Sequence, residues 1–326
     1  MPHDHHHHDA GGPGRLAPAE ARRVTGIATS ASVAVAVVLV LTKAVVWYLS
    51  GSVALLASLA DSALDLTASL TVLFAVRYAA EPADAEHRYG HGKAEAFAGV
   101  MQAIFVAASA ALLLREGIQH LFEPVTIQAS GWALAVMVLS IVLTIILVII
   151  QTRAVNQTGS IAVEGDRAHY FSDLGSNLAV MAGIAGSVYL GWLWLDAAVA
   201  LGVAVWLGIT AWGVAKGALD QLMDRELPDE ERERIRHLAH GEDPRIIDIH
   251  QLRTRASGPL VHIQFHLGLP ADLSLREAHE IEVGCERRLL AVYPAADIII
   301  HADPHGAAEP HGAEFFRAGT AANHDH

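Results

Sequence analysis

The chain has 326 residues, of which 52% are hydrophobic and 17% are charged, and its formal net charge at pH 7 is −13. This acidic balance argues against a nucleic-acid partner, because affinity for nucleic acid depends on neutralising phosphates with Lys and Arg. The single cysteine, Cys285, excludes an internal disulfide framework and fits a reducing cytosolic compartment. We expect its thiol to pack inside a domain.

The charged residues are unevenly distributed along the chain. Five runs contain no Asp, Glu, Lys or Arg and have about the length, ~20 residues, that a helix needs to cross a bilayer. These runs are residues 24–42, 96–114, 124–152, 174–195 and 197–215. A sixth run, residues 53–80, is interrupted by Asp61 and Asp65 but is otherwise apolar as far as Val76. The predicted fold is a membrane all-α bundle of six transmembrane helices.

Six spans place both termini on the same side of the membrane. The connections after residue 49 and around residues 123 and 191 contain no Lys or Arg. The opposite ends of the runs carry Arg15, Arg22, Arg23, Arg77, Arg88, Lys93, Arg153 and Arg167. Basic residues are enriched in cytoplasmic connections, so we expect both termini in the cytoplasm. The first apolar run follows a polar stretch and is long, which favours an anchor over a cleavable signal peptide.

A second domain is predicted at residues 224–304, after the transmembrane domain at residues 22–217. Apolar residues alternate with His262, Gln264 and His266 in the stretch 261–269, which is typical of a strand with one buried face. Residues 246–255 are the expected partner strand, with Gly258 and Pro259 in the turn. Ser274 and Glu277 form a capping box for a helix to about residue 291, and residues 296–303 form a last strand. The order indicates a cytosolic α+β domain, ferredoxin-like and metallochaperone-like.

Both ends of the chain are rich in histidine, and we expect residues 1–21 and 305–326 to be disordered tails. Residues 3–9 include five histidines, which favours native low-affinity capture of metal or, alternatively, an expression tag. The second tail carries His305, His311, His324 and His326.

Two spans carry pairs of metal-ligand residues at the same spacing. Asp61 and Asp65 are four apart and project from one helix face, and His169 and Asp173 repeat this spacing near the end of the fifth span. Acids within a membrane are costly and mark functional sites, although Lys43 could neutralise the first pair and helix capping could explain the second. Three carboxylates and one imidazole suit tetrahedral Zn²⁺ and can accept Fe²⁺ or Cd²⁺. Mg²⁺ or Ca²⁺ would need more oxygen ligands.

Two further metal sites are predicted outside the spans. The loop after the second span contains Asp84, His87 and His91, whose spacing permits a three-ligand site or a merely structural loop. The cytosolic domain contains His250, His262, His266, His279, His301 and Asp303. His301 and Asp303 share a strand face, whereas His262 is the weakest candidate. One or two zinc ions fit this group, and unliganded surface histidines are the alternative.

Together these features resemble the cation diffusion facilitator family, in its bacterial ferrous-iron/zinc efflux pump branch. The resemblance covers roughly residues 22–304 and is carried by SLADSALDLTASL, PADAEHRYGHGKAEA, HYFSDLGSN, LMDRELPDEE, HQLRTRASGP and IIIHADP. It places the transport site on Asp61, Asp65, His169 and Asp173, and a loop site on Asp84, His87 and His91. It places a binuclear zinc site on His250, His266, His279, His301 and Asp303.

The resemblance also implies a homodimer in the bacterial inner membrane, with a charge interlock between Lys93 and Asp224 near the dimer interface. Two features depart from the family pattern: the His-bearing tails, and Ala302 between the last two ligands, where a polar residue is expected.

The predicted function is efflux of a divalent transition metal, with Zn²⁺/H⁺ antiport as the mechanism. Three acids close together cannot easily all remain ionised, so protons occupy the empty site and metal displaces them. Fe²⁺, Cd²⁺ or Mn²⁺ as the main load is one alternative, and a membrane metal sensor that transports nothing is another. An enzyme is disfavoured, because the sequence contains no nucleophile motif, no HExxH and no glycine-rich phosphate loop.

Overall fold

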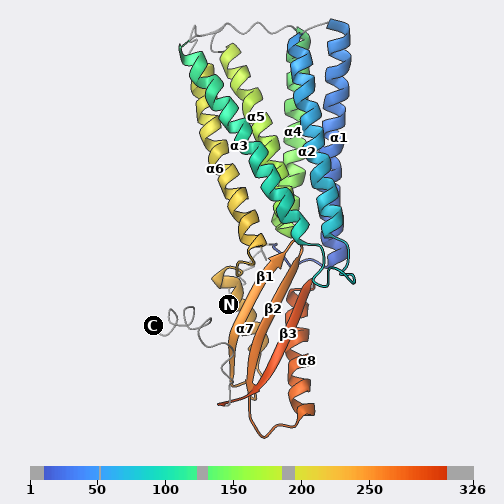
Figure 1. Ribbon diagram of the computed structural model, residues 1–326, viewed down its shortest axis with the longest axis vertical. Coiled ribbons are helices and arrows are strands. Elements are labelled where there is room, and N and C mark those ends of the chain that lie inside the picture. The colour runs from blue at the N-terminus through green and yellow to red at the C-terminus, as the bar shows by residue number, and fades with distance from the viewer. Residues whose placement is uncertain (1–10, 51–52, 123–130, 186–194, 307–326) are drawn as a thin grey trace, which may run out of the picture. The chain divides into compact units, whose positions relative to one another are not determined.

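The computed structural model describes residues 11–50, 53–122, 131–185 and 195–306 (Figure 1). The histidine runs before residue 11 and after residue 306 lie outside this part of the chain. Two compact units are present: residues 1–226 with 255–262 and 293–296, and residues 227–254 with 263–292 and 297–326. Long helices make up most of the first unit, and a small sheet with helices follows them in the chain. The predicted fold class is confirmed.

Within its described residues, the helical part contains six long helices. They are α1 (Pro18–Ser50), α2 (Val53–Ala79), α3 (Lys93–Phe122), α4 (Gly131–Thr158), α5 (Ile161–Ala185) and α6 (Leu195–Leu222). Five of them, all except α5, are long and apolar enough to cross a membrane. Helix α5 has 25 residues, about 38 Å at the usual helical rise, but carries four charged side chains. We call the half of the bundle with the end of α1, the start of α2 and the end of α3 the distal half.

The bounds of three helices differ from the sequence-based expectation. Helix α5 begins at Ile161, so His169 and Asp173 lie well inside it and the expectation of a helix end there is wrong. Asp166 is fully buried and His169 is 6% exposed, so the polar half of α5 is covered by neighbouring helices and hydropathy does not detect it. Helix α3 continues eight residues beyond the predicted end at 114. Helix α1 starts at Pro18, inside the predicted tail, since Pro suits the first turn of a helix.

The helices pack as two neighbouring groups (Figure 1). Helix α1 contacts α2 and α4, while α3, α5 and α6 contact one another, and contacts of α4 with α5 and of α2 with α3 join the groups. Small residues allow close approach of the helices. A Cβ on Gly175 of α5 would lie 2.6 Å from Val203 Cγ1 of α6, so any larger residue there would force the Val203 side chain to shift.

The C-terminal part has the predicted helix, two-strand, helix, strand order. Its elements are α7 (Asp229–His240), β1 (Asp248–Ser257), β2 (Leu260–Leu269), α8 (Leu275–Val292) and β3 (Ala296–Pro304), and the sheet order is β1-β2-β3. The turn between β1 and β2 uses Gly258 at a φ of 58°. The predicted capping box is confirmed: Ser274 N donates to Glu277 Oε2 at 2.8 Å and Glu277 N donates to Ser274 Oγ at 3.4 Å.

Cys285 is fully buried in α8, and its thiol donates to the carbonyl oxygen of Ala239 at 3.1 Å. Burial raises the pKa of the Cys285 thiol, so little reactive thiolate is present at neutral pH. We expect iodoacetamide to alkylate Cys285 slowly in the folded protein and quickly after denaturation, as measured by intact mass. A Cys285→Ala, Ala271→Cys variant, with its thiol on an exposed turn, is the control. Equal native rates in the two proteins would contradict this burial.

Candidate metal-binding sites

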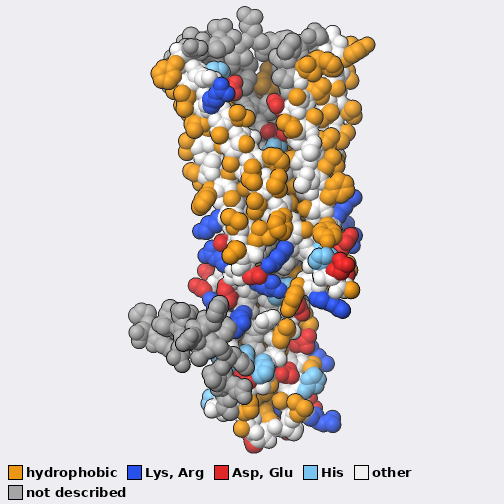
Figure 2. Space-filling view, viewed as in Figure 1, with side chains coloured by type: hydrophobic (Ala, Val, Ile, Leu, Met, Phe, Trp, Pro, Cys, Tyr) orange, Lys and Arg blue, Asp and Glu red, His pale blue; other side chains and the backbone are white. Residues whose placement is uncertain are grey.

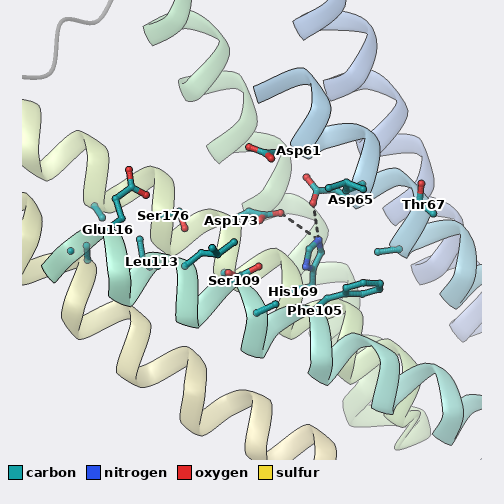
Figure 3. Close-up of a pocket in the computed structure, with 18 of the residues that line it drawn as sticks. Asp61, Asp65, Thr67, Phe105, Ser109, Leu113, Glu116, His169, Asp173 and Ser176 are labelled. Atoms are coloured by element: carbon teal, nitrogen blue, oxygen red, sulfur yellow. Dashed lines mark hydrogen bonds and ion pairs between the residues drawn. The ribbon is translucent and has the colours of Figure 1, made fainter. Parts of the chain in front are cut away.

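The spans bring three of the four predicted ligands together. Ligand atoms of Asp65, His169 and Asp173 all lie within 4.8 Å of one another. His169 Nε2 is 3.1 Å from Asp65 Oδ1 and 4.0 Å from Asp173 Oδ2, as the dashed lines in Figure 3 mark. We call these three residues the bundle trio. Its imidazole between two carboxylates offers one nitrogen and several oxygen ligands, which suits Zn²⁺.

Asp61, the fourth predicted ligand, is not part of the bundle trio but lies one turn away on α2. Both Asp61 and the bundle trio line a cavity of about 530 Å³. The close-up shows Asp61 above Asp65 on this cavity (Figure 3). In the space-filling view, acidic side chains lie in a hollow between apolar walls in the distal half (Figure 2). Asp61 therefore faces the same cavity as the bundle trio, one helical turn from Asp65.

Lys43 of α1 also reaches this region, but its hydrogen bonds go elsewhere. Its ammonium donates to Ser62 Oγ at 2.6 Å and to the carbonyl oxygen of Ser58 at 3.2 Å, both on α2. Among the described residues it makes no ion pair with Asp61 or Asp65 within 4 Å. Neutralisation of that pair by direct contact with Lys43, the alternative raised from the sequence, is thus not found in this arrangement.

Asp166 is a buried acid that sequence reasoning did not single out. Its Oδ2 accepts hydrogen bonds from Ser32 Oγ at 2.5 Å and Gln151 Nε2 at 2.8 Å, and its Oδ1 accepts one from Gln102 Nε2 at 3.4 Å. These partners lie on α1, α4 and α3, and none of the four side chains is more than 1% exposed. These contacts connect α1, α3, α4 and α5 about one helical turn before His169 of the bundle trio.

A pattern in the sequence could have identified Asp166. Asp166, His169, Tyr170 and Asp173 follow the i, i+3, i+4, i+7 spacing of one helix face. Tyr170 belongs to the same polar layer, since its hydroxyl lies 2.9 Å from Ser69 Oγ and donates to the carbonyl oxygen of Ser32 at 3.1 Å. This stretch of the α5 face is therefore polar, and it is buried at Asp166, His169 and Tyr170.

The loop between α2 and α3 brings its three predicted ligands together. Ligand atoms of Asp84, His87 and His91 lie within 4.8 Å of one another, with His91 Nε2 3.4 Å from Asp84 Oδ2. Asp84 Oδ1 accepts the backbone N–H groups of His87 and Glu86 at 2.6 and 2.8 Å. These hydrogen bonds, that of His87 first, hold the pKa of Asp84 below its usual range, so the carboxylate is ionised and able to bind a cation.

In the C-terminal part, Asp303 of β3 is the centre of a third cluster. His266 Nδ1 lies 2.7 Å from Asp303 Oδ2, and His301 Nε2 lies 2.9 Å from Asp303 Oδ1. Ligand atoms of His250, His266 and Asp303 all lie within 4.8 Å. Burial by itself raises the pKa of Asp303. The hydrogen bond to His266 and the charges of His266, His301 and His250 outweigh this effect, so the pKa is lowered overall.

Asp248 is an additional member that the sequence did not predict. His250 Nδ1 lies 2.9 Å from Asp248 Oδ2, while His250 Nε2 lies 3.4 Å from Asp303 Oδ2. A carboxylate that accepts from Nδ1 leaves the lone pair of Nε2 for a metal, the usual arrangement around zinc. The donor set of two imidazoles and a carboxylate fits a zinc ion, and His250, His266 and Asp303 would hold it.

Two predicted histidines lie apart from the cytosolic cluster. The side chain of His279 on α8 is 71% exposed and lies 3.7 Å from Glu282. His262 is buried, although its strand position suggested a polar face, and its ring packs 5.8 Å from that of Tyr89. Neither residue belongs to a described ligand group.

The predicted charge interlock is present as an ion pair within the chain. Lys93 Nζ and Arg255 Nη1 each lie 3.0 Å from Asp224 Oδ1. Partial burial raises the pKa of Asp224, but the hydrogen bonds from Lys93 and Arg255 outweigh it and lower the pKa. Asp224 also has a positive φ of 56°, a conformation that Asp tolerates better than most residues.

The sequence matches two known protein domains. A family described as the cation efflux transmembrane domain matches residues 30–223, and one described as the cation efflux protein cytoplasmic domain matches residues 227–305. A protein named cation-efflux pump FieF from Shewanella oneidensis is 44% identical over 278 residues, which cover 85% of this chain and 93% of that protein. A protein of the same name from Yersinia enterocolitica is 43% identical, over 88% of this chain and 95% of that protein. Another from Klebsiella pneumoniae is 42% identical, over 86% of this chain and 93% of that protein.

Proposed function

The chain belongs to the cation efflux family, and from that premise we propose that it exports a divalent transition metal, chiefly Zn²⁺, in exchange for protons. The observation that carries this proposal is the position of His169 Nε2, 3.1 and 4.0 Å from carboxylate oxygens of Asp65 and Asp173. One imidazole with carboxylates is a ligand set for Zn²⁺, and Fe²⁺, Cd²⁺ and Mn²⁺ are the competing loads.

Proton coupling follows from the chemistry of the same atoms. His169 Nε2 lies 3.1 Å from Asp65 Oδ1, which is hydrogen-bonding distance, so a proton can bridge the two atoms when no metal is bound. A metal needs the lone pair of that nitrogen and a free carboxylate oxygen, so its binding displaces the proton. If the bundle trio opens alternately to the two sides of the membrane, inward proton movement drives the metal outward.

We further propose that the protein works as a homodimer in the bacterial cytoplasmic membrane, with both termini in the cytoplasm. The distribution of Lys and Arg supports this orientation. In the cytosolic domain, zinc held by His250, His266 and Asp303 would join β1, β2 and β3, since each strand contributes one ligand. Bound zinc would then link the cytosolic metal level to the state of this domain.

The test is metal-dependent proton flux in proteoliposomes, measured with Zn²⁺, Fe²⁺, Cd²⁺, Mn²⁺ and Mg²⁺ in turn. We expect Zn²⁺ to produce the fastest exchange, Mg²⁺ none, and Asp173→Ala to abolish exchange because the bundle trio loses a ligand. Glu164→Gln, an acid on the same helix outside the bundle trio, is the matched control. Wild-type exchange by Asp173→Ala, or zinc movement without protons, would refute the mechanism.

A further inference from the structure

The end of α3 carries a third pair of metal-ligand residues that the proposed mechanism does not use. Glu116 and His120 are four residues apart in the part of α3 beyond the predicted span. Both line the 530 Å³ cavity that contains the bundle trio and Asp61. The close-up shows Glu116 on α3 across the cavity from α2 (Figure 3). The charged neighbour Arg115 does not line the cavity.

The spacing of this pair is suited to binding one metal ion. Residues four apart lie on one helix face, one above the other, as do the two zinc-binding histidines of helical HExxH motifs. The cavity thus receives such pairs from three helices: Asp61 and Asp65, His169 and Asp173, and Glu116 and His120. An alternative is that Glu116 and His120 are polar only because they lie near a helix end at the membrane surface. Exposure to the membrane surface does not require both an acid and an imidazole to line the cavity.

The depth of the pair places it on the distal side of the bundle trio. Glu116 lies six residues before the end of α3, and Asp65 of the bundle trio lies twelve residues after the start of α2. At 1.5 Å per residue, Glu116 is about 9 Å and Asp65 about 18 Å from the distal ends of their helices. His120 is one turn closer to the distal end. Metal that leaves the bundle trio in this direction passes the pair.

We propose that Glu116 and His120 form a second binding site for a divalent transition metal, on the distal side of the bundle trio in the same cavity. One carboxylate and one imidazole bind an ion with water in the remaining positions. Such a site is weaker than a three-ligand site, which suits an ion that must be released. The direction of transit rests on the proposed function, but metal binding by the pair does not.

The first experiment tests binding in the full-length protein in detergent, with Zn²⁺ alone as the probe. Diethyl pyrocarbonate modifies reagent-accessible imidazoles, and mass spectrometry measures the labelling of His120 separately from that of other histidines. With Zn²⁺ tenfold above its dissociation constant, labelling of His120 should slow about tenfold. Glu116→Ala should remove this protection, whereas Arg115→Ala and Asp65→Ala should keep it. Labelling of His120 that is insensitive to Zn²⁺, or protection that survives Glu116→Ala, would overturn the proposal.

The second experiment separates a binding role from a structural one by zinc transport kinetics. Glu116→His places two imidazoles four apart, so metal should bind more tightly and leave more slowly, with KM and turnover both lowered. Glu116→Ala should raise KM. If both substitutions change turnover alone, or if neither changes KM, Glu116 and His120 do not form a metal-binding site on the transport route. Absence of zinc flux in the wild type would refute the proposed function and leave the labelling result intact.

Discussion

Replacement of His169 by Asp is expected to lower the rate of zinc exchange by ~100-fold or more. Even the loss of a residue that only orients a metal ligand typically lowers metal affinity or activity by about 10 to 100-fold. His169 supplies the nitrogen of the bundle trio, and its Nε2 approaches both carboxylates. An all-oxygen set favours harder ions, so the ratio of Mn²⁺ to Zn²⁺ transport should rise.

Competition between the two ions in proteoliposomes measures this ratio directly. His240→Asp makes the same chemical change at an exposed imidazole at the end of α7 and should leave the ratio unchanged. If His169→Asp kept the wild-type preference for Zn²⁺, the nitrogen of His169 would not determine the selectivity of the site.

Replacement of Asp166 by Ala is expected to destabilise the helical bundle by ~3 kcal/mol or more, because breaking a buried, hydrogen-bonded charge or polar network has costs of this size. Ser32, Gln102 and Gln151 would lose their shared acceptor in a place without access to water. Their helices, α1, α3 and α4, would lose a common contact with α5.

Unfolding followed by tryptophan fluorescence in detergent would measure this loss. Glu164→Ala is the control, because it removes an acid from the same helix whose contact with Arg167 is 3.9 Å long and partly exposed. Such pairs contribute at most ~1 kcal/mol. Equal stability of the two variants would mean that the Asp166 network does not hold the helices together.

The candidate ligands on α2 were predictable because a carboxylate inside an apolar run is costly and therefore informative. Asp61 and Asp65 interrupt such a run. Alternation along β2 likewise predicted the buried apolar face, although it misplaced His262, which is buried. Asp166 was harder to predict, because its neighbours in the sequence are also polar and do not mark it as unusual. The helical spacing places Asp166 on the face of His169 and Asp173, but the packing of α1, α3 and α4 around α5 is what shows that this acid is buried.

The end of α3 was missed for a related reason. A search for uncharged apolar runs detects only the part of a helix that could face lipid. The charged residues Arg115 and Glu116 therefore seemed to end the span. The helix continues to Phe122 because its intrahelical hydrogen bonds do not depend on apolar side chains. Whether Glu116 faced a cavity or the membrane surface depended on the positions of α2 and α5, which the local sequence does not specify.

The close contact between Gly175 of α5 and the Val203 side chain of α6 has a consequence for how the bundle trio could open. We expect α5 and α6 to move together, because sliding one helix along the other would push Val203 against the α5 backbone. The contact between His169 Nε2 and Asp65 Oδ1, 3.1 Å apart, joins α5 to α2 instead. If α5 moves away from α2, the proposed metal ligands separate at the same time, so release of the ion and opening of the cavity would be one event.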